Sequence, residues 1–276
     1  MLIPALGIVG GLVILASGAE ALVHGASSLA RRLGVSPLVV GLTVVSIGTS
    51  LPELVVSVGA ALQGSGGIAL GNVVGSNIAN LALILGVAAL VHPMTVKAKV
   101  VRLDGPILVG VSLLFAGMVW DGTLGRWDGL ILVVGILAYV VYNVRSAPDE
   151  PPAVRSEFEE GTPGPYALAT DLGLVAAGLV GLVAGAQLLV QGATTIAALF
   201  GVPPVVVGLT VVAVGTSLPE LATSVAAARR GQGDIAVGNA VGSSIFNLLG
   251  ILGVTVLVQP LSTATLGWVD IGIMVA

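Results

Sequence analysis

Two glutamates lie in the middle of long apolar runs, and each ends the same motif, Gly-Thr-Ser-Leu-Pro-Glu. The first motif ends at Glu53 and the second at Glu220. In a helix, Thr49 and Ser50 can share a face with Glu53, because residues three and four apart are neighbours. A carboxylate at membrane depth is costly and marks a functional site. With its two hydroxyls, each motif offers hard oxygen donors, which suit Ca²⁺ and Na⁺ better than softer transition metals.

The proline of each motif should bend its helix. Pro52 has no N–H group to donate, and its ring clashes with the carbonyl of Gly48. Pro219 stands in the same relation to Gly215. A bend leaves backbone carbonyl oxygens without helical partners, so each motif adds carbonyl ligands to its carboxylate and hydroxyls.

A second motif, Gly-Asn-x-x-Gly-Ser-x-Ile-x-Asn, follows each of the first, at 71–80 and 238–247. It places a serine and an asparagine four residues apart, and the pairs are Ser76 with Asn80 and Ser243 with Asn247. Two such helices crossing the bent pair would close a cage of about six oxygens. Structural roles remain open, because Gly-x-x-x-Gly spacing is typical of helix packing and an intramembrane serine often bonds its own backbone.

The charge of this cage would suit two kinds of cation. One Ca²⁺ neutralises two glutamates, and so do two Na⁺. This overlap is a physical basis for competition between the ions, and therefore for exchange.

Both motifs belong to a duplicated segment in which one copy maps onto the other at a constant offset of 167 residues. Residues 36–60 and 203–227 are identical at 18 of 25 positions, and 69–93 and 236–260 at 16 of 25. The duplication predicts two halves with the same local structure.

Composition assigns the chain to the membrane. It is 56% hydrophobic and only 9% charged, with a mean hydropathy of +1.10, whereas soluble domains are about 25% charged. Apolar segments of spanning length fall near 2–28, 38–62, 68–91, 105–120, 128–144, 168–198, 205–228 and 235–258, with a ninth from Trp268. We therefore expect an all-α membrane protein of two inverted five-helix repeats, about ten transmembrane helices, of which the chain as given ends in the ninth.

Three parts follow from this organisation. Residues 1–145 form the first membrane repeat, and 167–276 form the second, which is incomplete at its C-terminal end. Between them, residues 146–166 are acidic and rich in proline, which is typical of a linker.

The basic residues predict the orientation. An odd number of spans per repeat makes the copies enter the membrane from opposite sides. One side of the predicted membrane holds Arg31, Arg32, Lys97, Lys99, Arg102, Arg145, Arg155, Arg229 and Arg230, and the other holds Arg126. By the positive-inside rule the first side is cytoplasmic, so the N-terminus is outside and the linker is cytoplasmic. Glu20 corresponds to Gln187 in the second copy, and we expect it to have a structural or vestibule role.

The paired motifs resemble the two α-repeats of the calcium/cation antiporter superfamily, on the sodium/calcium exchanger branch of prokaryotic type. The resemblance covers nearly the whole chain outside the linker. It implies ten helices in two inverted repeats, four central sites in a diamond, and sliding of the first and sixth helices over the core. The related proton/calcium exchangers carry a different signature, Gly-Asn-x-x-Glu, in place of Gly-Thr-Ser-Leu-Pro-Glu.

The resemblance also implies a set of ligands. Ca²⁺ would be held by Glu53, Glu220 and the carbonyls of Thr49 and Thr216, with Asn80 and Asn247 completing the central position. One flanking Na⁺ site would use the carbonyl of Ser46 with Ser50, Glu53 and Ser76. The other would use the carbonyl of Ala213 with Ser217, Glu220 and Ser243. Well-studied exchangers of this branch often carry aspartate at the position of Asn247, so this chain lacks a titratable group there.

These features predict a sodium/calcium antiporter, not an enzyme, that works by alternating access as a multi-pass protein of a cell (inner) membrane. Ca²⁺ and Na⁺ would be its transported substrates and the lipid bilayer its surroundings. We expect no cofactor and no nucleic-acid partner, and the sequence indicates no particular protein partner. Two alternatives remain: an exchanger coupled to protons or moving another divalent cation, and a transport-inactive membrane protein with a binding or assembly role.

Overall fold

The computed structural model describes residues 2–34, 37–94, 96, 98–146, 167–201, 213–264 and 266–275. Apart from one pair of two-residue strands, the regular structure in these ranges is helical. The predicted linker 146–166 lies outside the described residues except for its first position, and so does the stretch 202–212 of the second copy.

The first half begins with one long helix and continues through helices that change pitch. Its elements are α1 (Leu2–Leu33), α2 (Pro37–Val40), η1 (Gly41–Val45), α3 (Ser46–Thr49), α4 (Leu51–Leu62), α5 (Gly66–Ile78), η2 (Ala79–Ile84), α6 (Leu85–Val91), η3 (Val100–Asp104), α7 (Gly105–Met118), η4 (Val119–Asp121), β1 (Thr123–Leu124) and α8 (Arg126–Ser146). The segments η1, η2 and η3 are π-helical turns.

The second half repeats the order of the α-helices, but its strand stands earlier than β1 does in the first half. Its described elements are α10 (Leu168–Leu199), α12 (Ala213–Thr216), α13 (Leu218–Arg229), α14 (Gly233–Phe246), η7 (Asn247–Ile251), α15 (Leu252–Val258), β2 (Leu261–Ser262) and α16 (Trp268–Val275). The helices α4 and α13 have 12 residues each, and α6 and α15 have 7 each. The duplication seen in the sequence is therefore a duplication of structure.

Six of the described helices are long and apolar enough to cross a membrane. They are Leu2–Leu33, Gly66–Val91, Val100–Asp121, Arg126–Arg145, Leu168–Ala193 and Gly233–Val258. A seventh candidate span is the pair Gly41–Thr49 and Leu51–Leu62, which is bent by 49°. These spans confirm the predicted all-α membrane fold, and the bend confirms a kink in the first motif, although it lies at Ser50, before Pro52.

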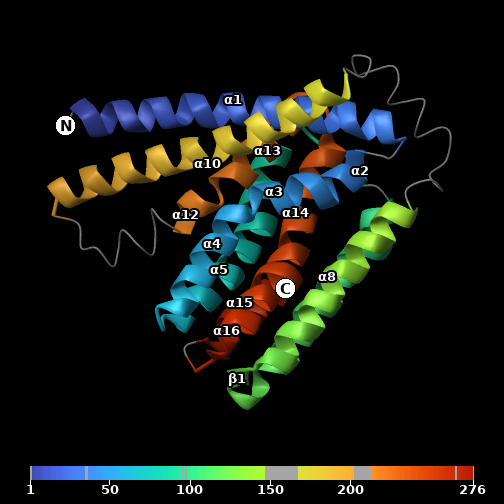
Figure 1. Ribbon diagram of the computed structural model, residues 1–276, viewed down its shortest axis with the longest axis vertical. Helices are drawn as coiled ribbons and strands as arrows, with labels where there is room; N and C mark the ends of the chain where they lie inside the picture. The colour runs from blue at the N-terminus through green and yellow to red at the C-terminus, as the bar shows by residue number, and fades with distance from the viewer. Residues whose placement is uncertain are drawn as a thin grey trace.

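The long helices α1 and α10 run side by side in opposite directions across the rest of the bundle (Figure 1). Their contact runs along glycines spaced seven apart on both helices, at 11, 18 and 25 and at 178, 185 and 192. A Cβ atom at Gly178 would lie 2.6 Å from the backbone nitrogen of Leu22, and one at Gly11 would lie 2.7 Å from the carbonyl of Gly185. The two backbones therefore approach each other directly, as small residues permit in membrane helices.

Polar contacts hold α1 at two places, near its C-terminal end and near its middle. Near its C-terminal end, Asp171 of α10 accepts hydrogen bonds from Ser28 Oγ at 2.6 Å and from Arg32 Nε at 2.9 Å. Towards the middle of α1, Glu20 pairs with Arg230, which follows α13. The first contact joins α1 to its partner helix, whereas the second joins α1 to the helices that carry the motifs.

The span formed by α14, η7 and α15 lies at the centre of the bundle and is the most buried of the six. Its equivalent in the first half, α5 to α6, leaves one face exposed. The short strands β1 and β2 pair antiparallel, with Thr123 opposite Ser262, and join the α7–α8 turn to the segment after α15. The centre of the fold is therefore where the motifs of both repeats meet.

Candidate cation site

The bend in each motif lies at the serine. Ser50 separates α3 from α4 with φ −86° and ψ 7°, and Ser217 separates α12 from α13 with φ −89° and ψ 5°. Pro52 and Pro219 then lie in the first turn of the following helix, where a missing N–H is tolerated. Each proline thus begins a new helix, and each glutamate lies in its first turn.

The two breaks face each other, and their side chains cross between the repeats. Ser50 Oγ donates a hydrogen bond to Glu220 Oε1 at 2.8 Å, and Ser217 Oγ donates one to Glu53 Oε1 at 3.2 Å. The threonine before each serine lies near that same carboxylate. Each carboxylate is therefore held by the serine of the other repeat.

This crossing corrects the expected grouping of the flanking ligands. The sequence analysis placed Ser50 with Glu53 and Ser217 with Glu220, but each hydroxyl lies against the opposite carboxylate. The same exchange applies to the carbonyl of Ser46, which accepts a hydrogen bond from Ser243 Oγ at 3.4 Å. Residues three apart are neighbours only within an unbroken helix, and the break at the serine turns its side chain towards the other repeat.

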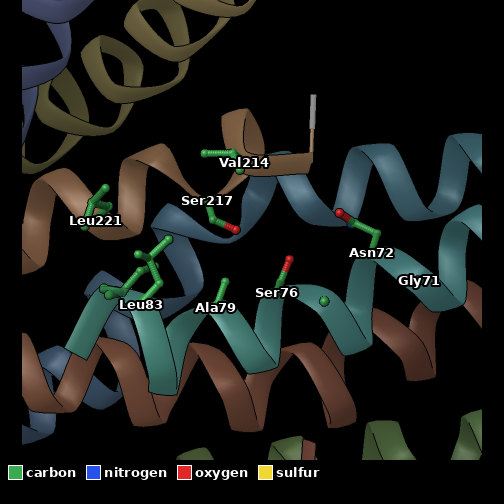
Figure 2. A pocket seen from close by; sticks show the side chains of 10 residues that line it. Gly71, Asn72, Ser76, Ala79, Leu83, Val214, Ser217 and Leu221 are labelled. Carbon is green, nitrogen blue, oxygen red and sulfur yellow. The ribbon is translucent and has the colours of Figure 1, made fainter. Parts of the chain in front are cut away.

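One group is therefore the carbonyl of Ser46 with Ser50, Glu220 and Ser243, and the other contains Ser217, Glu53 and Ser76. Ser76 and Ser217 line one cavity of about 150 Å³ between α5 and the break before α13, and their hydroxyls point towards one another (Figure 2). Ala213 begins α12, four residues before Ser217.

The bond from Ser243 to Ser46 decides one of the open structural alternatives. Ser243 reaches across to another helix instead of bonding its own backbone. The glycines of the second motif divide: a Cβ at Gly242 would lie 2.8 Å from Leu42 Cα, so this glycine serves helix packing. Gly71 and Gly75 have open space beside them and line the cavity.

The two site asparagines lie in π-helical turns at equivalent positions, η2 and η7. Both side chains are buried. Among the described residues, neither amide atom of Asn80 has a hydrogen-bond partner, and Asn247 Oδ1 has none. π-helical turns are frequent at functional sites, and these two place the unpaired amides beside the motifs.

The site holds negative charge without a described counter-charge. Glu53 and Glu220 are each 2% exposed, and the Oε2 atom of each has no hydrogen-bond partner among the described residues. The ion pairs that the structure gives, Arg32–Asp171 and Arg230–Glu20, involve neither carboxylate. Within the described ranges no three His, Cys, Asp or Glu side chains gather as a metal cluster. A cation here would therefore be bound by two carboxylates supplemented by hydroxyl, amide and carbonyl oxygens.

Two asparagines that the sequence analysis left without a role support this arrangement. Asn72 Nδ2 donates to the carbonyl of Glu53 at 3.2 Å and to Ser57 Oγ at 2.9 Å. Asn239 repeats both bonds on the carbonyl of Glu220 and on Ser224, at 3.2 and 3.0 Å. Both are the asparagine of the repeated Gly-Asn pair. An amide that recurs in both copies, inside an apolar segment where polar groups are costly, could have identified them from the sequence.

Asn239 also joins the two repeats, because its Oδ1 accepts a hydrogen bond from Thr49 Oγ1 at 3.2 Å.

A larger cavity of about 620 Å³ reaches the site from the side of α4 and α10. Its lining consists of Leu51, Pro52, Val55, Val56, Val183, Ala186, Gln187, Val190, Gln191, Gly215 and Thr216. Thr216 connects this cavity to the carboxylate of Glu53.

Comparison with known proteins agrees with this geometry. The family model described as "Sodium/calcium exchanger protein" matches residues 3–145 and 170–276. The putative antiporter CaxA of Alkalimonas amylolytica is 42% identical over 94% of this chain and 82% of its own length. The inner membrane protein YrbG of Escherichia coli K12 is 41% identical over 91% of this chain and 78% of its own length.

A relative named for its ions is the sodium/calcium exchanger MaX1 of Methanosarcina acetivorans, 36% identical over 92% of this chain and 83% of its own. Among solved structures, the sodium-calcium exchanger NCX_Mj superposes with a TM-score of 0.87 at 32% identity, covering 99% of this chain and 87% of that one. That structure comes from a protein soaked with Na⁺ and Sr²⁺. With a family match over both repeats and similarity in sequence and fold over more than nine tenths of this chain, the chain belongs to the sodium/calcium exchanger protein family.

Proposed function

We propose that the chain is an antiporter that exchanges Na⁺ for Ca²⁺ across a cell (inner) membrane. The observation that carries the proposal is the pair of buried carboxylates, each with one oxygen lacking a described partner. A buried, unpaired carboxylate oxygen is unfavourable, and a divalent cation between Glu53 and Glu220 would remove both deficits at once. The names of MaX1 and NCX_Mj favour the same two ions.

The ligands in this proposal come from both repeats. Ca²⁺ is held by Glu53 and Glu220 with the carbonyls of Thr49 and Thr216, and Asn80 and Asn247 contribute amide oxygens. The flanking Na⁺ sites follow the crossed groups described above. Since every carboxylate belongs to one repeat and its hydroxyl partners to the other, a cation in the site draws the two repeats together.

Transport follows an alternating-access cycle in this proposal. The cavity between α4 and α10 serves as the path from one face of the membrane to Thr216. The helix pair α1–α10 then moves over the motif-bearing core and opens the other face. The N-terminus lies outside, as the distribution of basic residues indicates.

Ca²⁺ uptake into proteoliposomes preloaded with Na⁺ tests the proposal. Uptake should follow the Na⁺ gradient and should not follow a pH gradient alone. Uptake driven by the pH gradient would instead favour the proton-coupled alternative, for which the name "putative antiporter" of CaxA leaves room. Ca²⁺ binding without flux under either gradient would indicate a transport-inactive protein.

A further inference from the structure

Asn77 of α5 is buried in the core and makes two side-chain contacts that its repeat counterpart cannot make. Its Oδ1 accepts a hydrogen bond from Asn247 Nδ2 at 3.1 Å, and its own Nδ2 points to Met274 Sδ at 3.8 Å. The equivalent position in the second copy is Ser244, which bonds the carbonyl of Ala240 in its own helix. This contact therefore belongs to one side of the site only.

The contact decides which amide atom of Asn247 is available to a cation. An amide has one oxygen, which accepts, and one NH₂ group, which donates. Because Asn77 takes the NH₂ group, Oδ1 is the atom left buried and without a described partner. Asn247 lies one helical turn beyond Ser243, whose hydroxyl touches the carbonyl of Ser46 at the site, so Asn247 lies on the same face.

Met274 makes the reverse orientation unfavourable. If the amide of Asn77 were turned over, its Oδ1 would face the thioether sulfur, which has no hydrogen to donate. Its NH₂ group would then meet Asn247 Oδ1, and the NH₂ group of Asn247 would point towards the cation. A donor directed at a cation is repulsive, so the chain from Met274 through Asn77 to Asn247 has one favourable orientation.

We propose that Asn77 is a positioning residue that holds Asn247 with its oxygen towards the transported cation, and that Met274 fixes Asn77 in that orientation. This inference rests on the proposed function. It also predicts a difference between the two site asparagines. Neither amide atom of Asn80 has a partner among the described residues, so that side chain is not held by a comparable contact.

The first measurement is equilibrium binding of Ca²⁺ to the purified full-length protein. Asn77→Leu keeps the approximate volume but removes the acceptor, so Asn247 is no longer held. Ca²⁺ affinity should fall about tenfold, the effect of losing one hydrogen bond that orients a buried polar group. Asn77→Asp retains an acceptor for Asn247 and should bind Ca²⁺ at least as tightly as the parent.

A double variant separates positioning from a structural role. A carboxylate presents an oxygen in either orientation, so Asn247→Asp does not need Asn77. In the Asn247→Asp background, Asn77→Leu should change Ca²⁺ affinity by less than about twofold, because no amide remains to be oriented. An equal loss in both backgrounds would overturn the inference, since damage to packing would weaken both alike.

Met274→Leu provides a second variant in case Asn77→Leu does not fold, because a change from methionine to leucine conserves volume. It should weaken Ca²⁺ binding about threefold, with the same suppression by Asn247→Asp. Parent-like binding by both Asn77→Leu and Met274→Leu would overturn the inference alone. Absence of Ca²⁺ binding by the parent would overturn the proposed function and the inference with it.

Discussion

At the scale of single residues, the site is built from hydrogen bonds that side chains of one motif copy make with side chains of the other. The hydroxyl of Ser50 donates a hydrogen bond to Glu220, and that of Ser217 donates one to Glu53. Thr49 donates one to Asn239. Hydroxyl donors satisfy one oxygen of each carboxylate but bring no positive charge. The second oxygen of each remains without a described partner, and the cation of the proposed function would supply it.

Replacing either glutamate should therefore remove Ca²⁺ transport. In Glu53→Gln or Glu220→Gln, one carboxylate faces a divalent ion in a poorly hydrated site, and Ca²⁺ affinity should fall by at least about 100-fold. Folding should be retained, because glutamine still accepts the serine hydrogen bond. Na⁺-driven Ca²⁺ flux and size-exclusion profiles measure the two effects. Asp270→Asn, an exposed carboxylate of α16, is the control and should transport normally; exchange by either glutamine variant would refute the site.

At the scale of elements, α1 and α10 form one tightly packed pair through facing glycines. A Cβ at Gly18 would lie 2.8 Å from the backbone nitrogen of Leu182, and one at Gly185 would lie 2.6 Å from that of Leu15. The bonds of Asp171 to Ser28 and Arg32 fix the register of the pair near one end. Such direct backbone contact favours movement of α1 and α10 together in the proposed cycle.

Gly178→Ala tests this packing. The added methyl would lie 2.6 Å from the backbone of Leu22, so the helices must separate, and the protein should lose about 1–3 kcal/mol of stability. Gly173→Ala is the matched control on the same helix, because nothing lies within 4 Å of its added Cβ. That change should be neutral or stabilising, since alanine favours helix over glycine. Thermal unfolding in detergent compares the two variants. Equal melting temperatures would argue against direct backbone contact between α1 and α10 at these glycines.

At the scale of the whole molecule, the two repeats differ in the contacts that α1 and α10 make with the rest of the bundle. Glu20 and His24 of α1 contact Arg230, and Ser27 Oγ donates to Gln232 at 2.9 Å. The counterparts of Glu20 and His24 in the second repeat, Gln187 and Gln191, line the 620 Å³ cavity. Of the structural and vestibule roles expected for Glu20, its ion pair with Arg230 fits the structural one. Polar contacts therefore join α1 to the end of α13, while the equivalent groups of the second repeat border a cavity.

Removing the contact of Arg230 should weaken the packing of α1 against α13. In Arg230→Gln, which copies the first repeat's Gln63, a cysteine placed at buried Ser27 should react several-fold faster with a thiol reagent, because the interaction that holds α1 against α13 is gone. Arg229→Gln removes the same charge one residue earlier, from an exposed side chain, and should leave the rate unchanged. If the cysteine at position 27 reacts at similar rates in both variants, Arg230 does not hold α1 against α13.

The inverted orientation can be tested with one matched pair of positions. Leu62 and Arg229 are repeat equivalents, both exposed, and each is the last residue of its helix, α4 or α13. The chain has no cysteine, so single cysteines there give an unambiguous signal. In intact cells an impermeant thiol reagent should label Leu62→Cys, and it should label Arg229→Cys only after the membrane is opened. Labelling of both without opening would contradict the proposed topology.

The amino-acid sequence was enough to predict the membrane class, the helical repeats, a bend in each proline-containing motif and a set of candidate cation ligands, whose binding of ions stays a prediction. These are local properties, set by composition, by periodicity and by one proline per motif. Only the tertiary structure decided which repeat's hydroxyl meets which carboxylate, through contacts that join residues 170 and 164 positions apart. It also revealed the π-helical turns at Asn80 and Asn247 and the contact of Asn77 with Asn247. Two copies of one motif contain the same donors and acceptors, so their pairing depends on how the helices cross in space, which spacing along the chain does not specify.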